Sequence, residues 1–79
     1  MSKVESEVAA VDLARQFLSA QEIEANELMG VYYVSGETLM LEIGQKRNSR
    51  YKVTFKGDSG FASVIVDAET GDSQLFYEL

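Results

Sequence analysis

The chain has 79 residues, of which 46% are hydrophobic and 25% are charged, a composition typical of one small folded domain. It contains no cysteine and no histidine, which excludes disulfides, thiol nucleophiles and serine–histidine–aspartate catalysis within these residues. The formal net charge of −6 at pH 7 disfavours contact with nucleic-acid phosphates and with anionic membrane surfaces.

The N-terminal segment and the apolar runs indicate a location. The first residues lack the basic and then apolar pattern of a signal peptide, and no apolar run is long enough to span a membrane. We therefore expect a cytoplasmic protein with a single domain over residues 1–79, although a mature exported domain would give the same pattern.

The first predicted element is an amphipathic helix over residues 4–19. Ser2 or Ser6 can cap its N-terminus, because a side-chain oxygen there accepts a hydrogen bond from a backbone amide. Apolar residues recur at the three- and four-residue spacing of one helix face, which predicts a buried stripe. The stripe contains Ala10, Leu13, Ala14, Phe17 and Leu18, and it is widened by Val4, Val8 and Val11. For residues 20–27 the sequence allows three conformations: a fraying helix end, a short turn or a crossing to the sheet.

From Leu28 onward the hydrophobic period changes from 3.6 to 2, which predicts β-strands. The strand at 39–43 is predicted from the period-two spacing of Leu39, Leu41 and Ile43. Short connections favour antiparallel neighbours. We therefore expect an α+β fold in which an N-terminal helix packs across a curved antiparallel sheet of four to five strands, a cystatin-like layout. The expected strands are 28–34, 39–43, 51–56, 61–66 and 74–79, joined by turns or loops at 35–37, 44–49, 57–60 and 67–71.

The second half of the chain carries a family-like pattern. Residues 51–55 read Tyr-Lys-Val-Thr-Phe, and residues 64–72 read Val-Ile-Val-Asp-Ala-Glu-Thr-Gly-Asp. Over residues 50–79 this pattern resembles the closing hairpins of PepSY domains, and the alanine-rich segment 8–20 stands where that family places its helix. The Val-Asp-x-x-Thr-Gly sequence at residues 66–71 is also similar to the corresponding segment of small immunity proteins of the NTF2-like and cystatin-like kinds.

The resemblance implies a role rather than a reaction. It implies a non-catalytic domain that binds or restrains another protein, as PepSY segments are thought to do for peptidases. The family offers no catalytic residues to this chain. Asp67, Thr70 and Gly71 correspond to the family pattern as turn residues only.

Positive charge is concentrated in one segment of this acidic chain. Residues 46–56 contain five cations and no acid, whereas the rest of the chain holds two cations and thirteen acids. Period-two spacing places Arg50, Lys52 and Lys56 on one strand face and directs the aromatic residues between them to the core. The ordinary interpretation is a solvated sheet face that lysines protect from edge aggregation. The functional one is a contact surface for an acidic partner, made of Lys46, Arg47, Arg50, Lys52, Lys56 and Tyr32.

Two further segments indicate how the chain contacts another protein. In a strand, one of Tyr32 and Tyr33 is expected to be buried and the other exposed, and exposed tyrosines are typical of interfaces. The apolar segment 74–79 is expected to form an edge strand, which can pair with a second copy of the chain or with a partner's strand. We therefore expect another protein as partner, with a homodimer through this edge as an alternative, and neither nucleic acid nor a membrane.

Other residue clusters point to no catalytic or metal chemistry. Asp67, Glu69 and Asp72 lack the Asp-x-Asp-x-Asp-Gly spacing of a calcium loop, and no phosphate-loop pattern follows Gly57. We therefore expect no enzyme, no cofactor and no metal, and the leading interpretation is a non-enzymatic protein-binding or inhibitory module. One alternative is an immunity-type protein that neutralises a basic toxin or nuclease. The other is a small-ligand carrier with a helix–sheet pocket lined by Phe17, Leu41, Val53 and Phe55.

Overall fold

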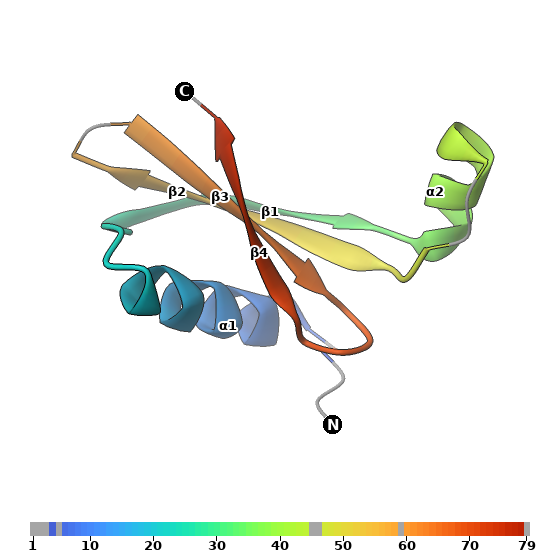
Figure 1. Ribbon diagram of the computed structural model, residues 1–79, viewed down its shortest axis with the longest axis horizontal. Helices are drawn as coiled ribbons and strands as arrows, with labels where there is room; N and C mark the ends of the chain where they lie inside the picture. The colour runs from blue at the N-terminus through green and yellow to red at the C-terminus, as the bar shows by residue number, and fades with distance from the viewer. Residues whose placement is uncertain (1–3, 5, 45–46, 59, 79) are drawn as a thin grey trace.

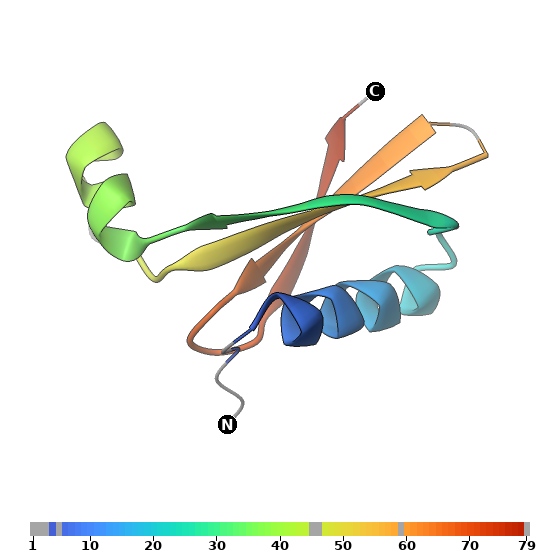
Figure 2. The same ribbon diagram turned by 180° about the vertical axis from the view of Figure 1, so that it is seen from behind.

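The computed structural model describes residues 4, 6–44, 47–58 and 60–78, and its main elements form a helix layer on a sheet layer (Figure 1). The four strands form one antiparallel sheet in the order β1-β2-β3-β4, and α1 lies across one face of it (Figure 2). The predicted α+β layout is therefore confirmed, with four strands. The elements are α1 (Glu7–Ala20), β1 (Glu27–Val34), α2 (Gly36–Ile43), β2 (Arg50–Gly57), β3 (Gly60–Asp67) and β4 (Ser73–Glu78).

Local hydrogen bonds and backbone geometry set the two ends of α1. The amide of Ala9 donates to Ser6 Oγ at 3.1 Å, which makes Ser6 the N-cap, whereas Ser2 lies outside the described residues. At the other end the chain turns, with Glu22 at a φ of 59°, and then crosses to β1. Of the alternatives left open for residues 20–27, the turn and the crossing both occur.

The buried stripe of α1 follows the predicted helical spacing. Ala10, Ala14 and Leu18 are completely buried, and the small alanines let the helix approach the sheet closely. Val8 does not extend the stripe, since its side chain is 77% exposed. It stands two residues before Ala10, which on a 3.6-residue turn is the opposite side of the helix.

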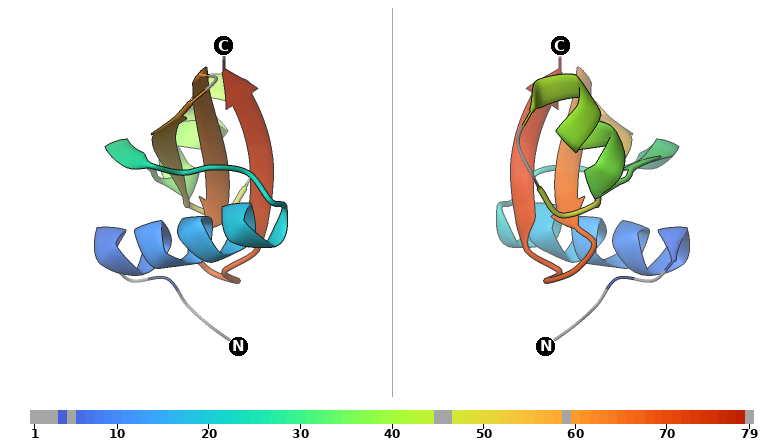
Figure 3. Two further views of the ribbon diagram at one scale, coloured as in Figure 1. Left: turned by 90° about the vertical axis from the view of Figure 1, so that its left-hand side faces the viewer. Right: turned by 90° about the vertical axis from the view of Figure 1, so that its right-hand side faces the viewer.

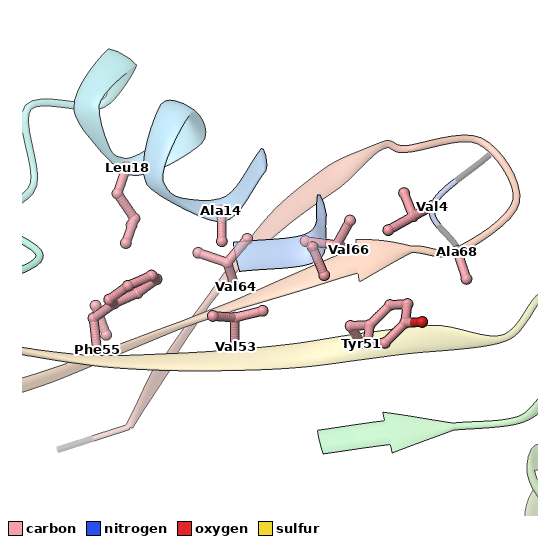
Figure 4. Close-up of a cluster of buried hydrophobic side chains, with 11 residues drawn as sticks. Val4, Ala14, Leu18, Tyr51, Val53, Phe55, Val64, Val66 and Ala68 are labelled. Atoms are coloured by element: carbon pink, nitrogen blue, oxygen red, sulfur yellow. The ribbon is translucent and has the colours of Figure 1, made fainter. Parts of the chain in front are cut away.

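The core lies between α1 and the sheet surface that this helix covers, which we call the inner face (Figure 4). Val53, Phe55 and Val64 are completely buried on the inner face. Leu18 of α1 points toward Phe55, and Ala14 points toward Val64 (Figure 4). Burying each such side chain stabilises the fold by about 1.5–3 kcal/mol. The alternation predicted for residues 51–56 is therefore confirmed, with the aromatic and valine side chains inside.

The prediction of a strand at 39–43 is wrong, because these residues belong to helix α2. Ser35 is its N-cap and accepts a hydrogen bond from the Thr38 amide at 3.1 Å, and Gly44 ends it in the left-handed region at a φ of 70°. Leucine, methionine and glutamate are strong helix formers, and between two capping residues their propensity outweighs a short period-two pattern. Helix α2 extends beyond the end of the sheet (Figure 1) and lies in front of the strands when the sheet is viewed from that end (Figure 3, right). Leu41 on α2 is 88% exposed.

The turn predicted at 67–71 is confirmed. Asp67 Oδ1 accepts hydrogen bonds from the amides of Glu69 and Thr70 at 2.8 and 3.0 Å. Gly71 closes the turn at a φ of 82°, a value that favours glycine. Burial acts to raise the pKa of Asp67, but the two amides and the Asn48 side chain outweigh it and hold that pKa below its ordinary value of 3.8.

The two edges of the sheet are β1 and β4. The prediction that the last strand is an edge strand is therefore confirmed, although Leu79 lies outside the described residues. Helices long and apolar enough to cross a membrane do not occur in the part of the chain that the structure describes.

Candidate functional site

The outer face of the sheet, opposite α1, is covered by no described element (Figures 1 and 2). Successive residues of a strand point to opposite faces, so the buried residues of the inner face fix which residues point outward. Outward-pointing positions are Glu27, Gly30, Tyr32 and Val34 of β1, Arg50, Lys52, Thr54 and Lys56 of β2, Phe61, Ser63, Ile65 and Asp67 of β3, and Gln74 and Phe76 of β4.

A lysine between two aromatic side chains occupies the centre of the outer face. Lys52 of β2 is the cross-strand neighbour of Tyr32, whose side chain is 66% exposed. The Lys52 Nζ atom lies 5.0 Å from the ring centroid of Phe76, which stands on β4 and is 47% exposed. A cation at this distance is attracted by the ring quadrupole, so the lysine side chain lies across β3. We call Tyr32, Lys52 and Phe76 the aromatic–lysine cluster.

Two hydrogen-bonded hydroxyl groups lie beside this cluster on the outer face. Thr54 Oγ1 and Ser63 Oγ lie 2.9 Å apart in a hydrogen bond. Ser63 is completely buried although it points to the outer face, and its neighbour on β4 is Phe76. Burying a hydroxyl group lowers the stability of the fold unless the group is hydrogen-bonded. The hydrogen bond between these two hydroxyls satisfies both of them. The side chains of the outer face therefore already exclude water from its centre.

A hollow of about 330 Å³ opens on the outer face next to the cluster. It lies where β1 has a bulge, between Leu28 and Gly30. A Cβ atom added at Gly30 would meet nothing within 4 Å, so the missing side chain leaves open space. Glycine inside a strand often marks a bulge or a site that another group approaches closely. The hollow is lined by Met29, Gly30, Val31, Tyr32, Lys52 and Thr54.

The charges along β2 differ between its ends and its centre. Arg50 stands opposite Asp67, and Lys56 stands opposite Glu27, so an acid is the cross-strand neighbour of a cation near each end of the strand. The Nε atom of Arg50 is buried with no hydrogen-bond partner among the described residues. Lys52 at the centre stands opposite Tyr32 of β1 and Ile65 of β3, and its Nζ atom lies over the ring of Phe76.

The structure brings together only part of the predicted contact surface. Tyr32, Arg50, Lys52 and Lys56 share the outer face. Arg47 lies elsewhere and lines a separate hollow of about 770 Å³ beside α2. Lys46 lies outside the described residues.

The expectation that one of the two adjacent tyrosines is buried is wrong. Tyr33 points to the inner face, yet it is 49% exposed, because it stands on the edge strand β1 and lines a hollow that is open to solvent. Its ring packs on Tyr51 instead, with the centroids 5.0 Å apart. Tyr32 is the more exposed of the two and belongs to the outer face.

The residues named for a helix–sheet ligand pocket do not line one cavity. Val53 and Phe55 are completely buried by packing, and Leu41 is on α2, beyond the end of the sheet. A hollow of about 710 Å³ that Glu7 of α1 helps to line is formed by other residues and is open to solvent. That set of four residues is therefore wrong as a binding site.

Gly30 and Phe76 are functional candidates that the sequence analysis does not single out. Gly30 interrupts an otherwise bulky segment, Leu28–Val34, and this interruption is the signal that marks it. Phe76 meets Lys52 across an intervening strand, and no pattern along the chain shows that pairing.

Neither a metal centre nor a known relative assigns a function. Within the described ranges, no group of three or more acidic, histidine or cysteine side chains is placed to hold a metal ion. Comparison with protein-family models, with curated proteins and with solved structures finds no match for this chain. The outer face is therefore judged on its own geometry.

Proposed function

We propose that this chain is a non-enzymatic protein-binding or inhibitory module that contacts its partner through the outer face of its sheet. The observation that carries the proposal is the aromatic–lysine cluster. One face of an antiparallel sheet is commonly solvated, and such a face usually carries polar side chains. Here Tyr32 and Phe76 expose large parts of their rings around a lysine. Exposed aromatic residues on a pre-formed surface are typical of the centre of an interface.

The charge of the outer face favours a partner that is acidic at the point of contact. Lys52 lies at the centre of the cluster, with Arg50 and Lys56 farther along the same strand. Complementary charge across an interface raises the rate of association and disfavours wrong partners. The chain as a whole has a net charge of −6, so the attraction to an acidic partner is confined to this face.

The resemblance of residues 50–79 to PepSY domains supports an inhibitory role. That family combines a helix and closing hairpins in modules that are thought to restrain other proteins. The shared turn at 67–71 connects β3 to β4, which carries Phe76 of the cluster.

The alternative is an immunity-type protein whose acidic surface neutralises a basic toxin. Thirteen acids against seven cations favour such a target on electrostatic grounds. The two functions differ in how they respond to charge reversal on the outer face. Replacing Lys52 by glutamate weakens binding to an acidic partner and leaves binding to a basic one unchanged or stronger.

The experiment that tests the proposal is a quantitative pull-down from a lysate of the source cells. The baits are the natural chain, Lys52→Glu, and Arg47→Glu as a charge-matched control away from the outer face. We expect a stoichiometric protein partner that the natural chain and Arg47→Glu capture equally and that Lys52→Glu loses. Equal capture by all three baits, or capture of no stoichiometric protein, contradicts the proposal. The folding of each bait is checked by its melting temperature.

A further inference from the structure

We propose that the chain has a second binding site, for a small organic cation, in the hollow between the N-terminal end of α1 and the turn at 67–71. The hollow has a volume of about 710 Å³, within the range of about 300–1,000 Å³ that is typical of small-molecule sites. We call it the tyrosine hollow, and its lining includes Val4, Glu7, Tyr33, Tyr51, Ala68 and Glu69. It lies on the inner face and is separate from the outer face, so the inference does not depend on the proposed function.

Two aromatic rings form one wall of the tyrosine hollow. Tyr33 and Tyr51 are cross-strand neighbours, and their ring centroids lie 5.0 Å apart with a tilt of 53° between the planes. Tyr33 is 49% exposed, so a ligand in the hollow can contact its ring. The face of a tyrosine ring attracts a cation that lies within about 6 Å of the ring centroid. This wall therefore favours a positively charged group.

The hydroxyl group of Tyr51 is available to a ligand. The side chain is only 7% exposed, yet its Oη atom has no hydrogen-bond partner within the part of the chain that the structure describes. Buried polar side-chain atoms are normally hydrogen-bonded, so this one is an exception that a ligand would remove. Figure 4 shows Tyr51 beside Val4 and Ala68, which also line the hollow. An N–H group of a bound cation can donate a hydrogen bond to the Oη atom.

The charged side chains of the tyrosine hollow are acidic. Among the described residues that line it, the charged ones are Glu7, the first residue of α1, and Glu69 in the turn. Neither carboxylate forms an ion pair with another described residue. Val4 and Ala68 add an apolar part to the lining. A ligand with a charged head and a short apolar body therefore matches the hollow in charge and in polarity.

An anion such as phosphate fits this hollow less well. The N-terminus of a helix by itself favours a negative charge. At α1, however, Ser6 Oγ already accepts a hydrogen bond from the Ala9 amide at 3.1 Å, and Glu7 adds a negative charge at this end. Glu69 adds a second one from the turn. The electrostatic preference of the hollow is therefore for a cation.

The test is a titration of the ¹⁵N-labelled chain with n-butylguanidinium, followed by the chemical shifts of the backbone amides at constant ionic strength. N-butylurea is the control ligand, because it has nearly the same shape and no charge, and inorganic phosphate is titrated in parallel. The proteins are the natural chain, Tyr51→Phe, Glu69→Gln and Asp12→Asn. Tyr51→Phe removes the hydroxyl and keeps the ring. Asp12→Asn is the charge-matched control for Glu69→Gln, because Asp12 is an exposed acid of α1 that does not line the hollow.

We expect n-butylguanidinium to give saturable shifts at residues of the tyrosine hollow, with a dissociation constant of about 1–10 mM, as suits so small a ligand. N-butylurea should bind about tenfold more weakly or not at all. Tyr51→Phe and Glu69→Gln should each weaken binding about threefold, the effect of losing one hydrogen bond or one solvent-exposed ion pair. Asp12→Asn should leave the dissociation constant unchanged. Melting temperatures of the variants should match that of the natural chain.

Three outcomes of the titration overturn the inference: no saturable shift in the tyrosine hollow, binding of N-butylurea or phosphate as tight as that of n-butylguanidinium, or equal affinity of Glu69→Gln and Asp12→Asn. Glu69→Gln is also used as a bait in the pull-down. A protein that the natural chain captures and Glu69→Gln loses would assign the hollow to a basic side chain of a partner and overturn the small-molecule site. None of these results affects the proposed function, which Lys52→Glu tests on the outer face.

Discussion

Replacing Asp67 by alanine removes the carboxylate that organises the turn between β3 and β4. Its Oδ1 atom accepts hydrogen bonds from the amides of Glu69 and Thr70 at 2.8 and 3.0 Å. Asp67 is only partly buried, so water replaces some of what is lost, and removal of comparable capping side chains costs about 0.5–2 kcal/mol. We therefore expect Asp67→Ala to lower the free energy of unfolding by about 1 kcal/mol at pH 7.

The effect of this substitution should depend on pH with a definite sign. Burial acts to raise the pKa of Asp67, but hydrogen bonds from two amides and from Asn48 lower it overall. A carboxyl with a lowered folded-state pKa contributes stability that is complete above its ordinary pKa of 3.8 and is lost as the pH falls through the folded-state pKa. The difference between the natural chain and Asp67→Ala should thus be constant at neutral pH and shrink below about pH 4.

Urea unfolding followed by far-ultraviolet circular dichroism measures this difference at pH 7, 5, 4 and 3. Taking the difference between two proteins cancels the titration of the other acids, which both proteins share. Asp67→Asn is the matched control, because it keeps an oxygen acceptor and removes the charge, and it should lie between the other two. Equal stability of the natural chain and Asp67→Ala at pH 7, or a difference that does not change with pH, would refute this account of the turn.

Three further substitutions or measurements test the fold and its edges. Leu18→Ala should lower the free energy of unfolding by about 2–5 kcal/mol, because it opens a cavity in the core under α1; a smaller loss in urea unfolding contradicts that packing. Gly36→Ala should cost about 1–3 kcal/mol, because a Cβ there collides with the carbonyl oxygen of Arg47; an unchanged melting temperature contradicts that close approach. Pairing of two copies along β4 stays a prediction: sedimentation equilibrium should give a dimer mass that Phe76→Lys reduces to a monomer, and a monomer mass at high concentration would exclude it.

Features that depend on local pattern could be predicted from the sequence. The helix stripe at Ala10, Ala14 and Leu18 and the alternation along β2 both follow from regular spacing of apolar residues. The turn at 67–71 follows from aspartate and glycine at positions that the turn requires. In each case the residues that decide the structure are neighbours in the chain.

The errors arise where the deciding information lies elsewhere. Leu39 to Ile43 alternate with period two, but the caps at Ser35 and Gly44 and the strong helix propensity between them prevail. Tyr33 is expected to alternate in burial with Tyr32, yet burial also needs a covering element, and Tyr33 stands on the edge strand β1 beside an open hollow.

The candidate site could be predicted only in part, for the same reason. Tyr32 and Lys52 are recognisable separately, but their proximity depends on the register between β1 and β2. The contact of Lys52 with Phe76 requires the order of three strands, and the hollow at Gly30 requires a bulge in the pairing. Such long-range geometry is set by packing rather than by local spacing.

Photocrosslinking in the source cells distinguishes a partner bound to the outer face from a partner bound to the helix side. A benzophenone amino acid replaces Tyr32 on the outer face in one variant and Val8 on α1 in another; these side chains are 66% and 77% exposed. Their similar exposure makes each a control for the other. We expect a discrete crosslinked protein of defined mass from position 32 and none from position 8. A discrete product from position 8 alone, or the same product from both positions, would contradict it.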